Sequence, residues 1–293
     1  MKNILKYYYN LLPDEIIRKK DEYKIKVNKY TYYFMPYYGN INDLIFIYSN
    51  IINNNPYIDE IVLNKNNNIL TYIDNINYIL LKSRINETNI SFYEIINFSY
   101  FIEKGVCNWR NLWINKIDYY EYHISQNKMK YKNLYNSFYY YAGLCECAIN
   151  LLNSVNSNNV NLYISHERIK KDTTNISFYN PLNMTLDSKV RDVCEYFKAQ
   201  FFYCENPLYK VKEYLSITPL TNDEAIMFFA RLLYPSYYFD VYDDILRGDY
   251  NKKKLDVIIS KNQVYEKFLE DVYFYMINIY NIPEIEWIIK KVA

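Results

Sequence analysis

The stretch from residue 160 to residue 200 constrains the fold of this chain more than any other part. It begins with a short apolar run at 160–164, which predicts a strand leading into a polar loop at 165–168. A second short run at 176–179 predicts another strand, and an Arg-Asp pair ending at Asp192 opens a predicted helix. The sequence therefore predicts strand, loop, strand and helix in close succession.

This layout resembles that of small-molecule kinases of the aminoglycoside phosphotransferase and choline kinase families. In these families a His-x-Asp loop supplies the catalytic base, and an Asn five residues after that Asp helps to hold metal. An Asp-x-Asp on the next strand binds magnesium, and an Arg-Asp pair starts a helix twelve residues after its first Asp. His166 and Asp192 stand at the matching histidine and helix-start positions.

The resemblance implies a structural role for both residues. Asp192 is expected in the first turn of its helix, where the helix dipole favours a carboxylate. From there its side chain is expected to form hydrogen bonds with the loop around His166, and His166 is expected to be mostly buried.

The residues that carry the chemistry in those families are replaced in this chain. Arg168 stands at the position of the base, Thr173 at that of the metal-binding Asn, and Asn180 at that of the first magnesium-binding Asp. A guanidinium cannot accept a proton at neutral pH, and a neutral amide is a poor substitute for a carboxylate on magnesium. Phosphoryl transfer depends on metal positioning and charge neutralisation. We therefore expect no catalytic residue, no metal site and no bound cofactor here.

The amino-terminal part lacks the nucleotide-binding features of a kinase as well. The whole chain has four glycines, which are not clustered, so no glycine-rich loop can bring backbone amides close to phosphates. The predicted strand at 30–35 has no lysine in its middle, where kinases place the lysine that pairs with phosphate.

The order of the predicted elements resembles that of a kinase. The first part should contain a helix over 3–19 that is interrupted at Pro13, strands at 23–28 and 30–35, a helix at 42–53, and strands at 58–63, 69–73 and 78–82. Residues 84–90 would form the hinge. The rest should be largely helical, at 91–103, 109–125, 131–152, 192–202, 209–216, 221–234, 237–247, 263–280 and 283–291, with Thr221 and Glu224 at capping-box spacing. We expect an α+β, bilobal, protein-kinase-like fold with a β-rich lobe at 1–84 and a helical lobe at 85–293.

Five motifs along the chain resemble the spore-coat-associated kinase-fold proteins of endospore-forming bacteria, the CotS and YutH group. They occur in family order at 113–122 (WINKIDYYEY), 140–149 (YYAGLCECAI), 164–169 (ISHERI), 190–196 (VRDVCEY) and 230–239 (ARLLYPSYYF). The resemblance implies association with the spore coat, a location on the cytoplasmic, mother-cell side, and other coat proteins as partners. It does not imply activity, because the group itself tends to lack the catalytic residues.

Three functions stay open. The first is a catalytically degenerate kinase fold that acts in coat structure or assembly. The second is an active small-molecule phosphotransferase with displaced residues, for which Asp172, Asn175 and Asp187 are the polar candidates near the loop. The third is a regulator that binds a ligand without catalysis.

Composition excludes several other classes. The net charge is +1, so nothing in the charge balance calls for nucleic acid or an anionic membrane. No signal peptide is recognisable, and no apolar run is long enough to span a bilayer. The five cysteines are irregularly spaced and odd in number, which favours free thiols over a disulfide framework.

Overall fold

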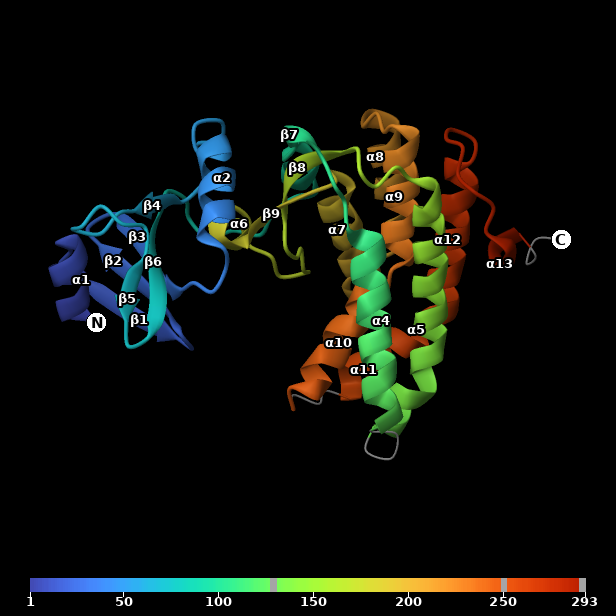
Figure 1. The fold of residues 1–293 in the computed structure, drawn as a ribbon, viewed down its shortest axis with the longest axis horizontal. Helices are drawn as coiled ribbons and strands as arrows, with labels where there is room; N and C mark the ends of the chain where they lie inside the picture. Colours follow the sequence, from blue (N-terminus) through green and yellow to red (C-terminus); the bar gives the residue numbers. More distant parts are fainter. Residues whose placement is uncertain (127–130, 249–251, 290–293) are drawn as a thin grey trace. The chain divides into compact units, whose positions relative to one another are not determined.

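The computed structural model describes residues 1–126, 131–248 and 252–289. Its contacts divide the chain into two compact units (Figure 1). The first unit consists of Met1–Ser91 together with Asp172–Leu186, and the second of Phe92–Lys171 together with the chain from Asp187 onward. The expected division was 1–84 and 85–293. In the structure the first boundary falls after Ser91, and the segment 172–186 returns to the first unit.

The first unit is built on an antiparallel sheet, six-stranded within the described residues. The strands follow the order β1, β2, β3, β6 and β4, and β5 also pairs with β6. They are β1 (Glu15–Lys19), β2 (Glu22–Val27), β3 (Tyr30–Pro36), β4 (Glu60–Val62), β5 (Thr71–Ile73) and β6 (Ile76–Ser83). The strands predicted from residue 23 to residue 82 are thus confirmed, with shifts of a few residues at their ends.

Each face of this sheet carries its own hydrophobic core. On one face Leu5 of helix α1 (Lys2–Tyr9) packs with strand residues that include Phe34 and Leu80. On the other face Leu44 of helix α2 (Ile41–Ile51) packs with strand residues that include Leu81. Neighbouring residues of a strand point to opposite faces, so Leu80 and Leu81 belong to different cores. Figure 1 shows α1 and α2 on opposite sides of the sheet.

The returning segment at 172–186 completes the second of these cores. It forms a short helix, α6 (Asn175–Phe178), and a 3-10 turn, η2 (Pro181–Asn183). Leu182 in that turn packs against the cluster of Leu44 and Leu81. The backbone of Asp59 donates a hydrogen bond to the carbonyl of Tyr179 over 3.1 Å, which ties the start of β4 to the segment.

The second unit is mainly helical. Its elements are α3 (Phe92–Asn97), β7 (Tyr100–Gly105), α4 (Trp109–Gln126), α5 (Lys132–Leu151), η1 (Leu152–Ser154), β8 (Val160–His166), α7 (Val190–Tyr203), α8 (Leu208–Ile217), α9 (Asn222–Leu233), α10 (Ser236–Leu246), α11 (Lys252–Ser260), α12 (Asn262–Met276) and α13 (Glu286–Ile289), with β9 (Met184–Asp187) at the boundary between the units. Strands β7 and β8 pair antiparallel. Helix α9 packs against both α5 and α7, and α5 also packs against α4 (Figure 1).

The capping box predicted for α9 is confirmed. The Thr221 hydroxyl accepts a hydrogen bond from the Glu224 backbone over 3.2 Å, and the Glu224 carboxylate accepts one from the Thr221 backbone over 2.8 Å. Two backbone amides at the helix start, which have no partner within the helix, are thereby hydrogen-bonded. No helix in the described ranges is both long and apolar enough to cross a membrane.

Three predicted elements were wrong. The helix expected over 3–19 ends at Tyr9, because Asn10 takes a left-handed conformation with φ of 53°, and Glu15–Lys19 instead forms an edge strand with β2. The helix expected over 91–103 stops at Asn97, because Tyr100–Gly105 finds a partner strand in β8. The strand expected at 176–179 is helix α6, whose first turn is capped by the Thr174 side chain.

Two further differences lie in the carboxy-terminal part. Helix α11 was not predicted, since Lys252–Ser260 begins with a run of lysines that hides its apolar periodicity. The helix expected at 283–291 is observed only as Glu286–Ile289, and Lys290 and Lys291 lie outside the described residues.

Candidate functional site

The loop after β8 is fastened to the start of helix α7 by a buried pair. His166 ends β8 and is 2% exposed, and Asp192 lies in the first turn of α7. One Asp192 oxygen accepts the backbone amide of His166 over 2.9 Å, and the other lies 2.6 Å from its Nδ1. The hydrogen bonds expected between Asp192 and this loop are therefore present. They fix both the backbone and the ring of His166.

Arg168, at the position where the related kinases carry their base, is held by two carboxylates. Its guanidinium bonds Glu195 of α7 over 3.0 Å and Asp240 of α10 over 2.6 Å. Burial by itself would lower the pKa of Arg168, but the two carboxylates raise it above its ordinary value. The side chain therefore stays a cation and cannot take a proton from a substrate.

Glu195 is the centre of this ion-pair network. Its two oxygens accept hydrogen bonds from Lys198 over 2.8 Å, Arg231 over 2.8 Å, Arg168 over 3.0 Å and the hydroxyl of Ser236 over 2.8 Å. Burial alone would raise the pKa of the Glu195 carboxyl, but these three cations hold it well below its usual range. A carboxylate with four donors has no free position for a metal ion or a substrate proton.

Lys198 is the most enclosed charged residue of the network, at 1% exposed. Burial lowers the pKa of its ammonium to about 8. The ammonium donates to Glu195, to the Ser236 hydroxyl over 2.7 Å, and to the backbone carbonyls of Arg231 and Tyr234 over 3.0 and 3.2 Å. These bonds tie α7 to the junction of α9 and α10, so the network has the properties of a structural clamp.

The positions that would hold metal lie in the first unit and have other bonding partners. Asn180 is 6% exposed; its oxygen accepts the Leu182 amide over 2.8 Å, and its amide group points to the Met35 sulfur at 3.5 Å. Asn180 thereby caps the η2 turn that carries Leu182 into the core of the unit. Thr173 is buried, and its carbonyl accepts the Ile90 amide over 3.4 Å.

Each of the three displaced candidates has its own surroundings. Asp172 is exposed, and Asn175 bridges the backbone at 86–88 with hydrogen bonds of 2.7 and 2.9 Å. Asp187 belongs to the second unit, where it accepts hydrogen bonds from Trp109 over 3.0 Å, from the next backbone amide over 2.7 Å, and from Arg191. Among the described residues no group of three His, Cys, Asp or Glu side chains is arranged to hold a metal ion.

Sequence reasoning missed the ion-pair network that holds Arg168. Glu195, Lys198 and Arg231 lie within apolar helical runs of α7 and α9, where charged residues are rarely buried unless they are paired. Glu195 and Lys198 are three residues apart, a spacing at which side chains of a helix can pair, and this was the signal that could have found them. Asp240 carried no such signal, since α10 also contains the neighbouring Asp243 and Asp244.

Comparison with known proteins identifies the family. A family model described as "Spore coat putative kinase YutH" matches residues 2–272. The chain belongs to the YutH family. One curated member, the endospore coat-associated protein YutH of Bacillus subtilis strain 168, is 26% identical over 157 residues, which cover 48% of this chain and 46% of the relative. The match thus spans about half the length of that relative.

Solved structures support the fold. An aminoglycoside phosphotransferase from Alicyclobacillus acidocaldarius has a TM-score of 0.61 at 9% identity, over 95% of this chain and 97% of that one. A spectinomycin phosphotransferase in its AMP-bound complex has a TM-score of 0.54 at 10% identity, over 93% and 96% of the two chains. At such identities the likeness concerns fold only. The α+β, aminoglycoside phosphotransferase-like fold expected from the sequence is confirmed.

Proposed function

We propose that this YutH-family chain is a catalytically degenerate kinase fold that serves the endospore coat through protein interactions. The observation that carries the proposal is the state of Arg168. At the position of the base it is a permanent cation, and it bonds Glu195 and Asp240, which also hold α7 and α10. The loop therefore contributes to packing where an active relative would place a proton acceptor.

The first unit supports the same proposal. Asn180 offers an amide where magnesium would need a carboxylate, and both ends of that amide have partners in the unit. Leu182 beside it is packed against the core.

Nucleotide binding tests the absence of catalysis. The protein is heated with ATP and with ADP, each with and without magnesium, and its melting temperature is compared with that of an active aminoglycoside phosphotransferase run in parallel. We expect no magnesium-dependent stabilisation and no ATP hydrolysis above a protein-free blank. A robust rise in melting temperature that requires magnesium would refute the proposal and favour the phosphotransferase.

Localisation tests the role in the coat. A fluorescent fusion produced in a spore-forming host should be diffuse during growth and gather around the forespore during sporulation. Arg168→Ala should leave the pattern unchanged, because no substrate chemistry is assigned to this residue. Truncation before Ala230 should abolish the pattern, since it removes the last turn of α9 together with α10, α11, α12 and α13. A fusion that stays diffuse while the host completes its spores would remove the coat assignment.

A further inference from the structure

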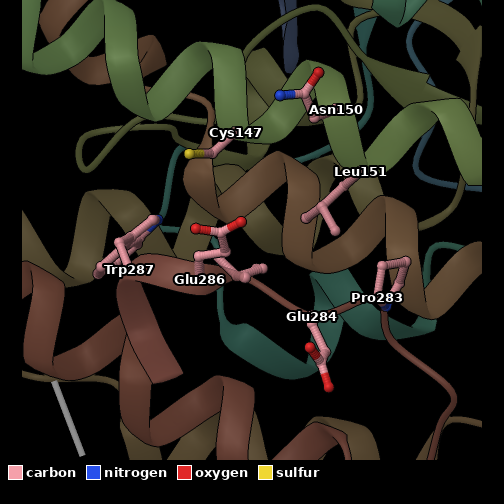
Figure 2. A pocket seen from close by; sticks show the side chains of 8 residues that line it. Cys147, Asn150, Leu151, Pro283, Glu284, Glu286 and Trp287 are labelled. Carbon is pink, nitrogen blue, oxygen red and sulfur yellow. The ribbon is translucent and has the colours of Figure 1, made fainter. Parts of the chain in front are cut away.

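Two adjoining hollows lie along helix α5 in the second unit, away from the Arg168 network. The first has a volume of about 460 Å³ and lies between α5 and the chain at 283–287. Figure 2 shows Cys147, Asn150 and Leu151 of α5 on one side of it, and Trp287 and the carboxylates of the carboxy-terminal segment on the other. The second hollow, of about 290 Å³, lies between α5 and α4.

Asn150 lines both hollows, so they meet on the surface of α5. Residues four apart on a helix lie one above the other. Glu146 and Asn150 therefore form one row along α5, and Cys147 and Leu151 form the next. We call the two hollows together the α5 groove.

The α5 groove is acidic. Glu284 and Glu286 line the first hollow, and Asp118 and Glu146 line the second, whereas neither lining contains a Lys or Arg among the described residues. Within the same residues, no ion pair involves Asp118, Glu146 or Glu284. A hollow lined by one sign of charge concentrates ligands of the opposite sign.

The groove also has an apolar and aromatic floor. Ile149 is half-buried and lies in the second hollow, while Leu151 lies in the first. Trp109 and Trp113 are 3% and 4% exposed, whereas Trp287 is half-buried at the edge of the first hollow. Tryptophan is the aromatic side chain that cations prefer, and it is enriched where proteins meet.

From this combination we propose that the α5 groove binds a basic amphipathic segment of a partner protein. Lysine or arginine side chains of the segment pair with the carboxylates at the rim, and its apolar side chains cover the half-buried Ile149 and Trp287 in the manner of a helix in a groove. The segment 283–287 lies beyond residue 272, where the family match ends, so five of the eight residues that line the first hollow come from outside the matched region. The proposal rests on the interaction role proposed above and gives it a surface.

The test uses a synthetic peptide of about 14 residues, the length of an average helix, made of leucine and lysine in helical alternation. Fluorescence anisotropy of the labelled peptide gives the affinity, and acrylamide quenching of the tryptophan fluorescence reports whether Trp287 is covered, since Trp109 and Trp113 are buried. The charge-reversal variant is Glu146→Lys with Glu284→Lys. Its matched control is Asp256→Lys, an exposed acidic residue of α11 that does not line the groove.

We expect saturable binding that weakens with salt, protects Trp287 from acrylamide, falls at least tenfold in the charge-reversal variant and is kept by Asp256→Lys. A peptide with glutamate in place of lysine should not bind. Any of three results overturns the proposal that the groove binds such a segment. They are equal binding to the charge-reversal variant, unchanged quenching at saturation, and the absence of saturable binding.

Localisation of the fluorescent fusions in cells distinguishes failure of the groove proposal from failure of the proposed coat function. If the charge-reversal fusion still gathers around the forespore, the α5 groove is not the recruiting surface, and the coat role stands. If the unaltered fusion stays diffuse while the peptide binds as expected, the coat role fails and the groove stands.

Discussion

Asp59 provides a measurable consequence of burial in the first unit. It precedes β4 and is 0% exposed, and neither oxygen of its carboxylate has a hydrogen-bond partner within the described residues. Extending the pairing of Glu60 with Lys82 by one residue places it opposite Ser83. Burial raises the pKa of Asp59 to about 7, and the nearby Ser83 hydroxyl, which falls short of hydrogen-bond geometry, offsets only part of that rise.

The size and sign of the effect follow from this pKa. An ordinary Asp in an unfolded chain has a pKa of 3.8, so the folded value of about 7 is a shift of about 3 units, or about 4 kcal/mol. Between these values the folded chain holds a proton that the unfolded chain has released. The free energy of unfolding therefore falls as pH rises from about 4 to about 7, and the loss is complete above that.

Asp59→Asn removes the titration and keeps the shape. The amide still leaves a buried polar group, which costs about 1–3 kcal/mol, so the net gain at pH 8 should be about 1–3 kcal/mol. At pH 4 the variant should be no more stable than the natural chain. Hydrogen exchange of the β4 and β6 amides, corrected for the intrinsic rate at each pH, measures the first unit alone.

The control is Asp21→Asn, which changes an exposed carboxylate in the turn between β1 and β2. It should leave the protection of β4 and β6 unchanged at both pH values. The reasoning about Asp59 would be refuted if the difference between Asp59→Asn and the natural chain were the same at pH 4 and pH 8.

Further predictions concern the ion-pair network around Glu195, which includes Arg168, Lys198, Arg231 and Asp240. Glu195→Gln should lower the free energy of unfolding by about 3–5 kcal/mol, since it leaves Lys198 buried without its carboxylate; urea unfolding followed by tryptophan fluorescence measures this. Arg168→Ala should cost less, about 1–3 kcal/mol, and a double-mutant cycle with Asp240→Ala should show coupling above 0.5 kcal/mol; additive effects would contradict the ion pair. Arg168→Asp should produce no ATP hydrolysis and should destabilise more than Arg168→Ala, because it adds a third carboxylate to the site. Asp192→Ala should speed hydrogen exchange at the end of β8 while leaving α12 unaffected.

The sequence predicted the framework of the fold because local patterns reported it. Alternation over β2 and β3, the long apolar face of α4, and the Thr221–Glu224 capping box are all set by residues close together in the chain. The contact of Asp192 with His166 was expected from the resemblance to small-molecule kinases. In these places local preference and tertiary packing agree.

The errors occurred where a distant partner decides the structure. The residues of β7 follow a helical run, and only pairing with β8 makes them a strand. Glu15–Lys19 is a different case, because its partner β2 begins only at Glu22 and the two strands form a local hairpin. The clamp around Glu195 could not be predicted either, since its members come from α7, α9, α10 and the loop after β8, and a charged residue in a helix is usually on its surface.

The return of residues 172–186 to the first unit also sets an order of events during synthesis. The ribosome must make Phe92–Lys171, which belong to the second unit, before Leu182 can reach the core around Leu44 and Leu81. At translation speeds of about 5–20 residues per second this interval lasts on the order of ten seconds. During that time the core beneath α2 lacks Leu182, and the apolar side chains beside that gap are open to chaperones or to another chain. A fragment that ends at residue 91 should keep this gap, so its sheet should be less stable than in a chain that reaches beyond residue 186.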